Sequence, residues 1–75
     1  MVARMQKSAD TLTRREIEVL TLSARGKTAA QIAKDLGITK RTVVAHRESI
    51  VRKLKAANLT HAVALALTTQ IIGAP

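Results

Sequence analysis

Residues 28–54, TAAQIAKDLGITKRTVVAHRESIVRKL, are the most informative part of the chain because they contain two helix patterns joined at a single glycine. A T-x-x-Q capping box opens the first pattern and predicts a helix over 28–36. Gly37 ends this helix, since glycine takes the left-handed conformation without steric cost, and a second helix is predicted over 40–55. Two short helices with a sharp turn are typical of a helix-turn-helix, although a plain helical hairpin with no nucleic-acid role shares this outline.

The second predicted helix separates into two faces at 3.6 residues per turn. Its inward face is expected to consist of Val43, His46, Ile50 and Leu54. The opposite face contains Arg41, Val44, Ala45, Glu48, Ser49 and Arg52, with Lys40, Arg47 and Lys53 on the flanks. A helix of this width fits the major groove of B-DNA, where basic side chains reach guanine, glutamate accepts from cytosine and a small apolar side chain lies against a thymine methyl.

The residues expected to contact DNA fall into two groups, those that contact bases and those that contact phosphates. We expect base contacts from Val44, Ala45, Arg47 and Glu48. We expect phosphate contacts from the starts of the two helices and from the basic end of the second, through Lys27, Thr28, Lys40, Arg41, Thr42, Arg52 and Lys53. Glu48 has two interpretations, either an ion pair with Arg52 one turn away or a contact to cytosine.

Helix patterns also precede and follow this pair. A capping box at Thr13 predicts a helix over 13–25, and a cap at Asn58 predicts a last helix over 59–72. The last helix is apolar on more than one side. One face is expected to close the core through Leu59, Val63, Ala66 and Leu67. The other face is expected to point outward and form a dimer interface through Ala62, Leu65, Thr69 and Ile72. The alternative is that the first helix and the N-terminal arm cover this face.

These four helices predict an all-α, tetrahelical domain over residues 12–72, with residues 1–11 as a flexible arm or linker remnant and residues 73–75 as a tail. The chain has 75 residues, enough for one small core, and contains no aromatic side chain to stack on unpaired bases. Thirteen Lys and Arg against five Asp and Glu give a formal charge of +8 and an isoelectric point near 11.3. Duplex DNA, bound through its phosphates with a steep salt dependence, is the expected partner.

The composition argues against several other functions. Cysteine is absent, and the two histidines and five carboxylates show no catalytic or metal-ligand spacing, so we expect neither an enzyme nor a cofactor or metal. The apolar-rich segment of 14 residues in the last helix is shorter than a membrane span. Residues 1–10 show no signal peptide, and the expected location is the cytoplasm, at the nucleoid.

Three blocks in this chain resemble the DNA-binding domain of LuxR/FixJ-type (GerE-like) bacterial transcription regulators. They are LTRREIEVL at 12–20, GKTAAQIAKDLGITKRTVVAH at 26–46 and RKLKAANLTHAV at 52–63. The chain departs from the family's pattern at Arg14, Gln31, Leu59 and His61. The resemblance implies a homodimer on a two-fold-symmetric operator, with the third helix in the major groove and the fourth at the dimer contact. It further implies a regulator in quorum sensing or two-component signalling, with RNA polymerase as another partner.

A second function stays open at this point. The chain would then be a helical protein-interaction module that heterodimerises with a full-length regulator through its last helix, without productive DNA binding. Salt-sensitive binding of the isolated chain to duplex DNA distinguishes the two functions.

Overall fold

The computed structural model describes residues 12–73, which form four α-helices and no strand. The helices are α2 (Arg14–Ala24), α3 (Ala29–Leu36), α4 (Lys40–Lys53) and α5 (Leu59–Thr68). The predicted arm over 1–11, and residues 74–75 of the predicted tail, lie outside the described residues. Within the described part, the all-α, four-helix prediction is confirmed. No helix of this part is long and apolar enough to cross a membrane.

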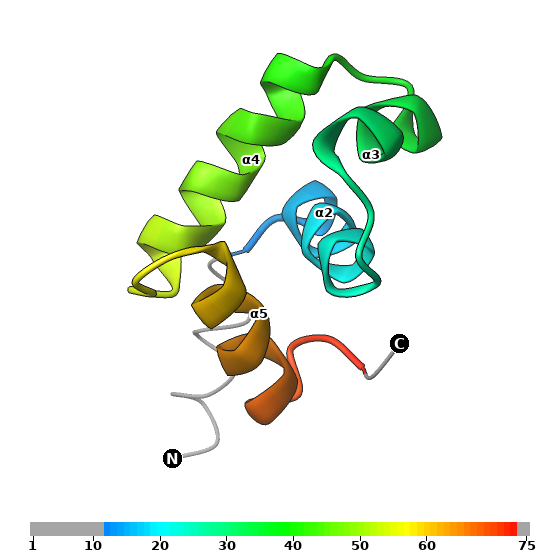
Figure 1. The fold of residues 1–75 in the computed structure, drawn as a ribbon. Helices are drawn as coiled ribbons and strands as arrows, with labels where there is room; N and C mark the ends of the chain where they lie inside the picture. Colours follow the sequence, from blue (N-terminus) through cyan, green and yellow to red (C-terminus); the bar gives the residue numbers. More distant parts are fainter. Residues whose placement is uncertain (1–11, 74–75) are drawn as a thin grey trace.

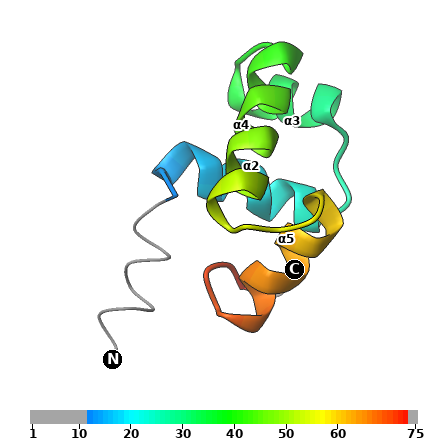
Figure 2. The same cartoon turned by 90° about the vertical axis from the view of Figure 1, so that its left-hand side faces the viewer.

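The helix α2 lies at the centre of the domain and contacts the three other helices. The helices α3 and α4 are joined by a tight turn and lie together on one side of α2 (Figure 1). The helix α5 lies on the other side, below the end of α4, in both views (Figure 2). Because α4 also contacts α3 and α5, it is held along much of its length.

Each helix starts behind a side chain that caps it. Four residues accept a hydrogen bond from the backbone N–H three positions later, and they are Thr13, Thr28, Thr39 and Asn58. In α2 and α3 the third residue of the helix bonds back to the N–H of the cap, which completes the two predicted capping boxes. These bonds satisfy donors that the start of a helix would otherwise leave unpaired.

Each helix also ends in a Schellman motif, in which a residue just past the end donates its N–H to a carbonyl five positions back. The donor and acceptor pairs are Lys27 and Leu22 at 3.2 Å, Ile38 and Ala33 at 3.0 Å, Ala56 and Val51 at 3.0 Å, and Ile71 and Ala66 at 2.9 Å. This motif needs one left-handed residue. Gly26 and Gly37 take this conformation after α2 and α3, at φ 86° and 68°.

After α4 and α5 the left-handed residue is not glycine. It is Lys55, at φ 56°, and Gln70, at φ 62°. These two turns make both helices shorter than predicted, since α4 was expected to run to residue 55 and α5 to residue 72. A glycine predicts such a turn from sequence, whereas a lysine or glutamine in the same position leaves no local signal.

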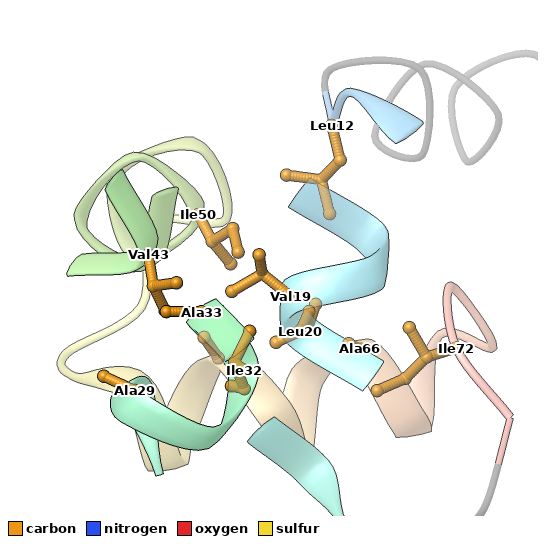
Figure 3. Packing of buried hydrophobic residues seen from close by; sticks show 11 residues of the cluster. Leu12, Val19, Leu20, Ala29, Ile32, Ala33, Val43, Ile50, Ala66 and Ile72 are labelled. Carbon is orange, nitrogen blue, oxygen red and sulfur yellow. The ribbon is translucent and has the colours of Figure 1, made fainter. Parts of the chain in front are cut away.

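The core is built from all four helices together with Leu12 before α2 and Ile72 after α5. In Figure 3, Ile50 of α4 faces Val19 of α2, and Val43 of α4 lies next to Ala33 of α3. The largest fully buried side chains are Leu20, Ile32, Ile50, Val19 and Val43. Burying a side chain of this size stabilises the fold by about 1.5–3 kcal/mol. Val43 and Ile50, the two buried residues of α4, therefore fix which face of this helix points outward.

The predicted division of α5 into an inner and an outer face is partly wrong. Ala62, expected to face outward, is 0% exposed, and Ile72 is 5% exposed. Ala62 is covered because α5 packs against both α2 and α4. Ile72 is covered because the left-handed turn at Gln70 sends the chain back onto the core (Figure 3). Of the predicted dimer residues, Leu65 is half-buried and Thr69 exposed, so these two remain accessible.

Candidate nucleic-acid interface

The outer face of α4 presents most, but not all, of the residues that the sequence predicts for DNA contact. The exposed residues of this helix include Lys40, Arg41, Val44, Ala45, Glu48 and Arg52. Val44 is 40% exposed, whereas its neighbour Val43 is 0% exposed. Two adjacent valines thus have opposite environments because the core holds one of them. The exposed valine and Ala45 add accessible apolar groups to a face that is otherwise charged.

The starts of α3 and α4 carry the predicted phosphate binders. Thr28, Lys40 and Arg41 are exposed, and the hydroxyl oxygen of the half-buried Thr42 lies 2.9 Å from that of Thr39. The ammonium of Lys27 donates to Asp35 at 2.8 Å on the surface. An exposed ion pair contributes at most about 1 kcal/mol, so this pairing leaves Lys27 able to exchange Asp35 for another anion. Both helix starts are also favourable positions for negative charge.

Glu48 and Arg52 are both exposed, and no ion pair joins them. The ion pairs among the described residues 12–73 join Arg15 to Glu18, Lys27 to Asp35 and Lys53 to Glu16. The first interpretation of Glu48, an ion pair with Arg52, is therefore wrong for the isolated domain. The carboxylate of Glu48 is left on the outer face of α4, facing solvent.

A buried carboxylate ties α4 to α2. Glu16 is 4% exposed, and its Oε1 accepts from the Thr13 N–H at 2.8 Å and from Lys53 Nζ at 2.9 Å. Its Oε2 accepts from Ser49 Oγ at 2.7 Å. Two predicted positions are corrected by this cluster. Ser49 does not lie on the outer face of α4, and the ammonium of Lys53 is paired with Glu16 instead of being free for a phosphate.

The surroundings of Glu16 keep it ionised. Burial alone would raise the pKa of Glu16, but hydrogen bonds from Ser49, from the Thr13 N–H and from Lys53, together with the Lys53 charge, lower it from 4.5 to about 2. The sequence pattern indicated only the capping box of this glutamate. Its partners Ser49 and Lys53 lie 33 and 37 positions away, which is beyond any local pattern.

Arg47 differs most from its predicted role as a base reader. It is half-buried, its Nε donates to Ser23 Oγ at 3.3 Å, and its Nη2 donates to the carbonyl oxygen of Lys27 at 3.1 Å. Both acceptors belong to the end of α2 and the turn that follows it. The guanidinium is therefore engaged inside the domain, because the turn between α2 and α3 lies beside α4 and offers two acceptors at the right spacing.

Other chemistry finds little support in the described residues. Within 12–73 no three carboxylates or histidines come together in a way that could hold a metal ion. The two helices joined at Gly37, the second with an exposed and largely charged face, instead define a helix-turn-helix domain.

Comparison with known proteins agrees with this class. Residues 10–66 match the family described as bacterial regulatory proteins, luxR family. The chain belongs to this family, which confirms the resemblance seen in its three sequence blocks.

Several curated relatives cover this region. The HTH-type quorum sensing-dependent transcriptional regulator RpaR of Rhodopseudomonas palustris is 54% identical over 61 residues, which are 81% of this chain and 25% of that protein. Transcriptional activator protein BjaR1 of Bradyrhizobium diazoefficiens is 49% identical over 61 residues, with the same two coverages of 81% and 25%. Transcriptional regulatory protein FixJ of Rhizobium meliloti is 43% identical over 65 residues, 87% of this chain and 30% of that protein. The chain thus spans less than a third of each relative.

Proposed function

We propose that this chain binds double-stranded DNA with sequence preference, as the DNA-binding domain of a transcription regulator. The observation that carries the proposal is the outer face of α4, whose exposed residues are held away from the core by the buried Val43 and Ile50 on the opposite side. The formal charge of +8 favours a polyanionic partner, and membership of the luxR family supports regulation of transcription. Such a regulator would act in the cytoplasm at the nucleoid, with RNA polymerase as a further partner.

In this proposal α4 enters the major groove. Base contacts come from Val44, Ala45 and Glu48, because these residues are exposed and lie on one face. Phosphate contacts come from both helix starts and from the far end of α4, through Lys27, Thr28, Lys40, Arg41, Thr42 and Arg52. Arg47 and Lys53 are left out of these groups, because their cationic ends already have partners inside the domain.

The first experiment is selection of bound sequences from a pool of random duplex DNA at about 150 mM salt, where phosphate attraction alone is weakened. Enrichment of a common motif supports the proposal and supplies the operator. Equal retention of all sequences argues against sequence preference. No retention at all favours the alternative, a helical interaction module that pairs with a full-length regulator.

Two substitutions on α4 separate its proposed roles. Arg41→Ala removes a phosphate contact, so binding to every duplex should weaken and the slope of log affinity against log salt should flatten by about one unit. Val44→Ala removes an apolar base contact, so the preference at one base pair should change while binding to random duplex stays the same. Titrations of both variants against the selected and a scrambled duplex, over a range of salt concentrations, measure this. Equal effects of both changes on both duplexes would contradict the division.

We further propose that the chain forms a homodimer through the accessible part of α5. Leu65 and Thr69 line a largely apolar hollow between α4 and α5, together with Lys53, Leu54, Lys55 and Ile71. A second copy seated there about a two-fold axis would bury the same surface on both chains and match a two-fold-symmetric operator. This interface uses two of the four predicted dimer residues and omits the buried Ala62 and Ile72.

Adjacent threonines provide a matched test of this interface. Thr69 lines the hollow, whereas Thr68 is exposed beside it, and the hydroxyl of each bonds to the carbonyl four positions back. Thr69→Lys would place like charges close together across the axis, so the dissociation constant of the dimer should rise about tenfold or more. Thr68→Lys adds the same charge outside the interface and should leave the dimer intact. Sedimentation equilibrium measures both, and equal behaviour of the two variants would rule out this surface.

A further inference from the structure

We propose that Arg47 is a positioning residue for DNA binding. Arg47 holds the turn between α2 and α3 against α4. It thereby keeps Lys27 and Thr28 within hydrogen-bonding distance of the DNA phosphates when α4 lies in the major groove. The inference rests on the proposed function. It assigns Arg47 a role through the protein itself, in place of the direct base contact predicted from sequence.

The turn is held by bonds on both sides of Lys27. The N–H of Lys27 donates to the carbonyl of Leu22 at 3.2 Å, and the carbonyl of Lys27 accepts from Arg47 Nη2 at 3.1 Å. Next along the chain, the N–H of Thr28 donates to Gln31 Oε1 at 2.9 Å, and its Oγ1 accepts from the Gln31 N–H at 3.2 Å. These other bonds join the turn to the last turn of α2 and to the first turn of α3. The bond from Arg47 connects this segment to α4.

The guanidinium suits this task because it has several donors in a fixed plane. One donor reaches Ser23 Oγ in the last turn of α2, at 3.3 Å, and another reaches the Lys27 carbonyl beyond the left-handed Gly26, at 3.1 Å. One side chain from α4 therefore bridges the two ends of the turn. A lysine, with its compact ammonium, would not reproduce both bonds in this geometry, and neutral donors would form weaker ones.

The consequence for DNA binding follows from the short range of hydrogen bonds. Phosphate contacts at Lys27 and Thr28 require donor–acceptor distances of about 2.7–3.2 Å, so a small shift of the turn relative to α4 breaks them. Loss of Arg47 should then weaken binding to all sequences, because phosphates carry no sequence information. A direct base reader would instead change the preference at one base pair.

A double-mutant cycle tests the inference. The variants are Arg47→Gln, Lys27→Gln and their combination, and the measurement is the dissociation constant on the selected duplex and on a scrambled one. Arg47→Gln should weaken binding to both duplexes by the same factor. Lys27→Gln alone should weaken DNA binding relative to wild type. In the double variant it should have little further effect, since Arg47→Gln has already displaced the turn. Arg41→Gln is the matched control, and its effect should multiply with that of Arg47→Gln, because Arg41 lies on α4 itself.

A second measurement without DNA reports on the turn directly. In Arg47→Gln the backbone amides of Lys27 and Thr28 should exchange with solvent faster, while those of Val19 and Leu20 in the core keep their protection. If Arg47→Gln does not fold, Ser23→Ala takes its place in the cycle. It removes one of the two acceptors and should give the same non-multiplicative pattern with a smaller effect.

The possible outcomes separate the two levels of the proposal. Multiplicative effects of the Arg47 and Lys27 substitutions, or unchanged amide exchange in the turn, would overturn the positioning role. A change of preference at a single base pair on loss of Arg47 would overturn it in favour of direct readout. Failure of the wild-type chain to bind either duplex would overturn the proposed function itself.

Discussion

Replacement of Ala62 with glutamate is expected to unfold the domain. Ala62 is 0% exposed and lies where α5 packs against α2 and α4, so the new carboxylate would be buried without a partner. Burial of an unpaired charge costs several kcal/mol, and a single core in a domain of this size rarely supplies more than about 3–5 kcal/mol in total. Thermal unfolding followed by circular dichroism should show no cooperative transition, and a proton–nitrogen correlation spectrum should lose its dispersion.

Ala64→Glu is the matched control for this prediction. Ala64 lies on the same helix and is exposed, so its side chain can extend into solvent. The unfolding free energy of the Ala64→Glu variant should stay within about 0.5 kcal/mol of the wild-type value. A folded Ala62→Glu variant with an ordinary melting curve would contradict the structure and restore Ala62 to the outer face of α5.

Replacement of Glu16 with glutamine is expected to cost about 3 kcal/mol of stability at pH 7, because a pKa lowered from 4.5 to about 2 favours the ionised folded form by about that amount. The contribution is fully present above pH 4.5, the ordinary value, and is lost as the pH falls toward about 2. The difference in unfolding free energy between wild type and Glu16→Gln should therefore shrink over this range. Urea unfolding at pH 7, 4 and 2.5 measures it.

Glu18→Gln provides the control on the same helix. Glu18 is exposed and its ion pair with Arg15, at 3.1 Å, lies on the surface. Its loss should change stability by at most about 1 kcal/mol at any of these pH values. Equal effects of the Glu16 and Glu18 substitutions, or a Glu16→Gln deficit that does not depend on pH, would show that the buried cluster does not stabilise the fold as inferred.

Glu16 also links stability to the proposed DNA interface. Its partners Ser49 and Lys53 belong to α4, so the carboxylate fixes how this helix is rotated about its own axis. Val43 and Ile50 fix the same rotation from the apolar side. The exposed face of α4 is thus set by Glu16 on the polar side and by these two residues on the apolar side, which explains why most of its residues follow the pattern read from the sequence.

The features of this protein that depend on near neighbours along the chain can be predicted from its sequence alone. The two capping boxes join residues three positions apart, and the turn after α3 needs only Gly37, so both are visible in the sequence. The period of α4 likewise predicts which residues are inside, because Val43 and Ile50 are apolar and the residues opposite are small or charged. The family could be identified for the same reason, since its motifs are continuous blocks.

Features that depend on distant partners are visible only in the packed domain. The side of α5 that is buried could not be read from a helix that is apolar on two sides, because packing against α2 and α4 selects it. The ends of α4 and α5 depend on left-handed turns at Lys55 and Gln70, which carry no glycine. Arg47 and Lys53 resembled free cations, but their acceptors lie 20 to 37 positions away. Only the docking of the helices brings such groups within hydrogen-bonding distance.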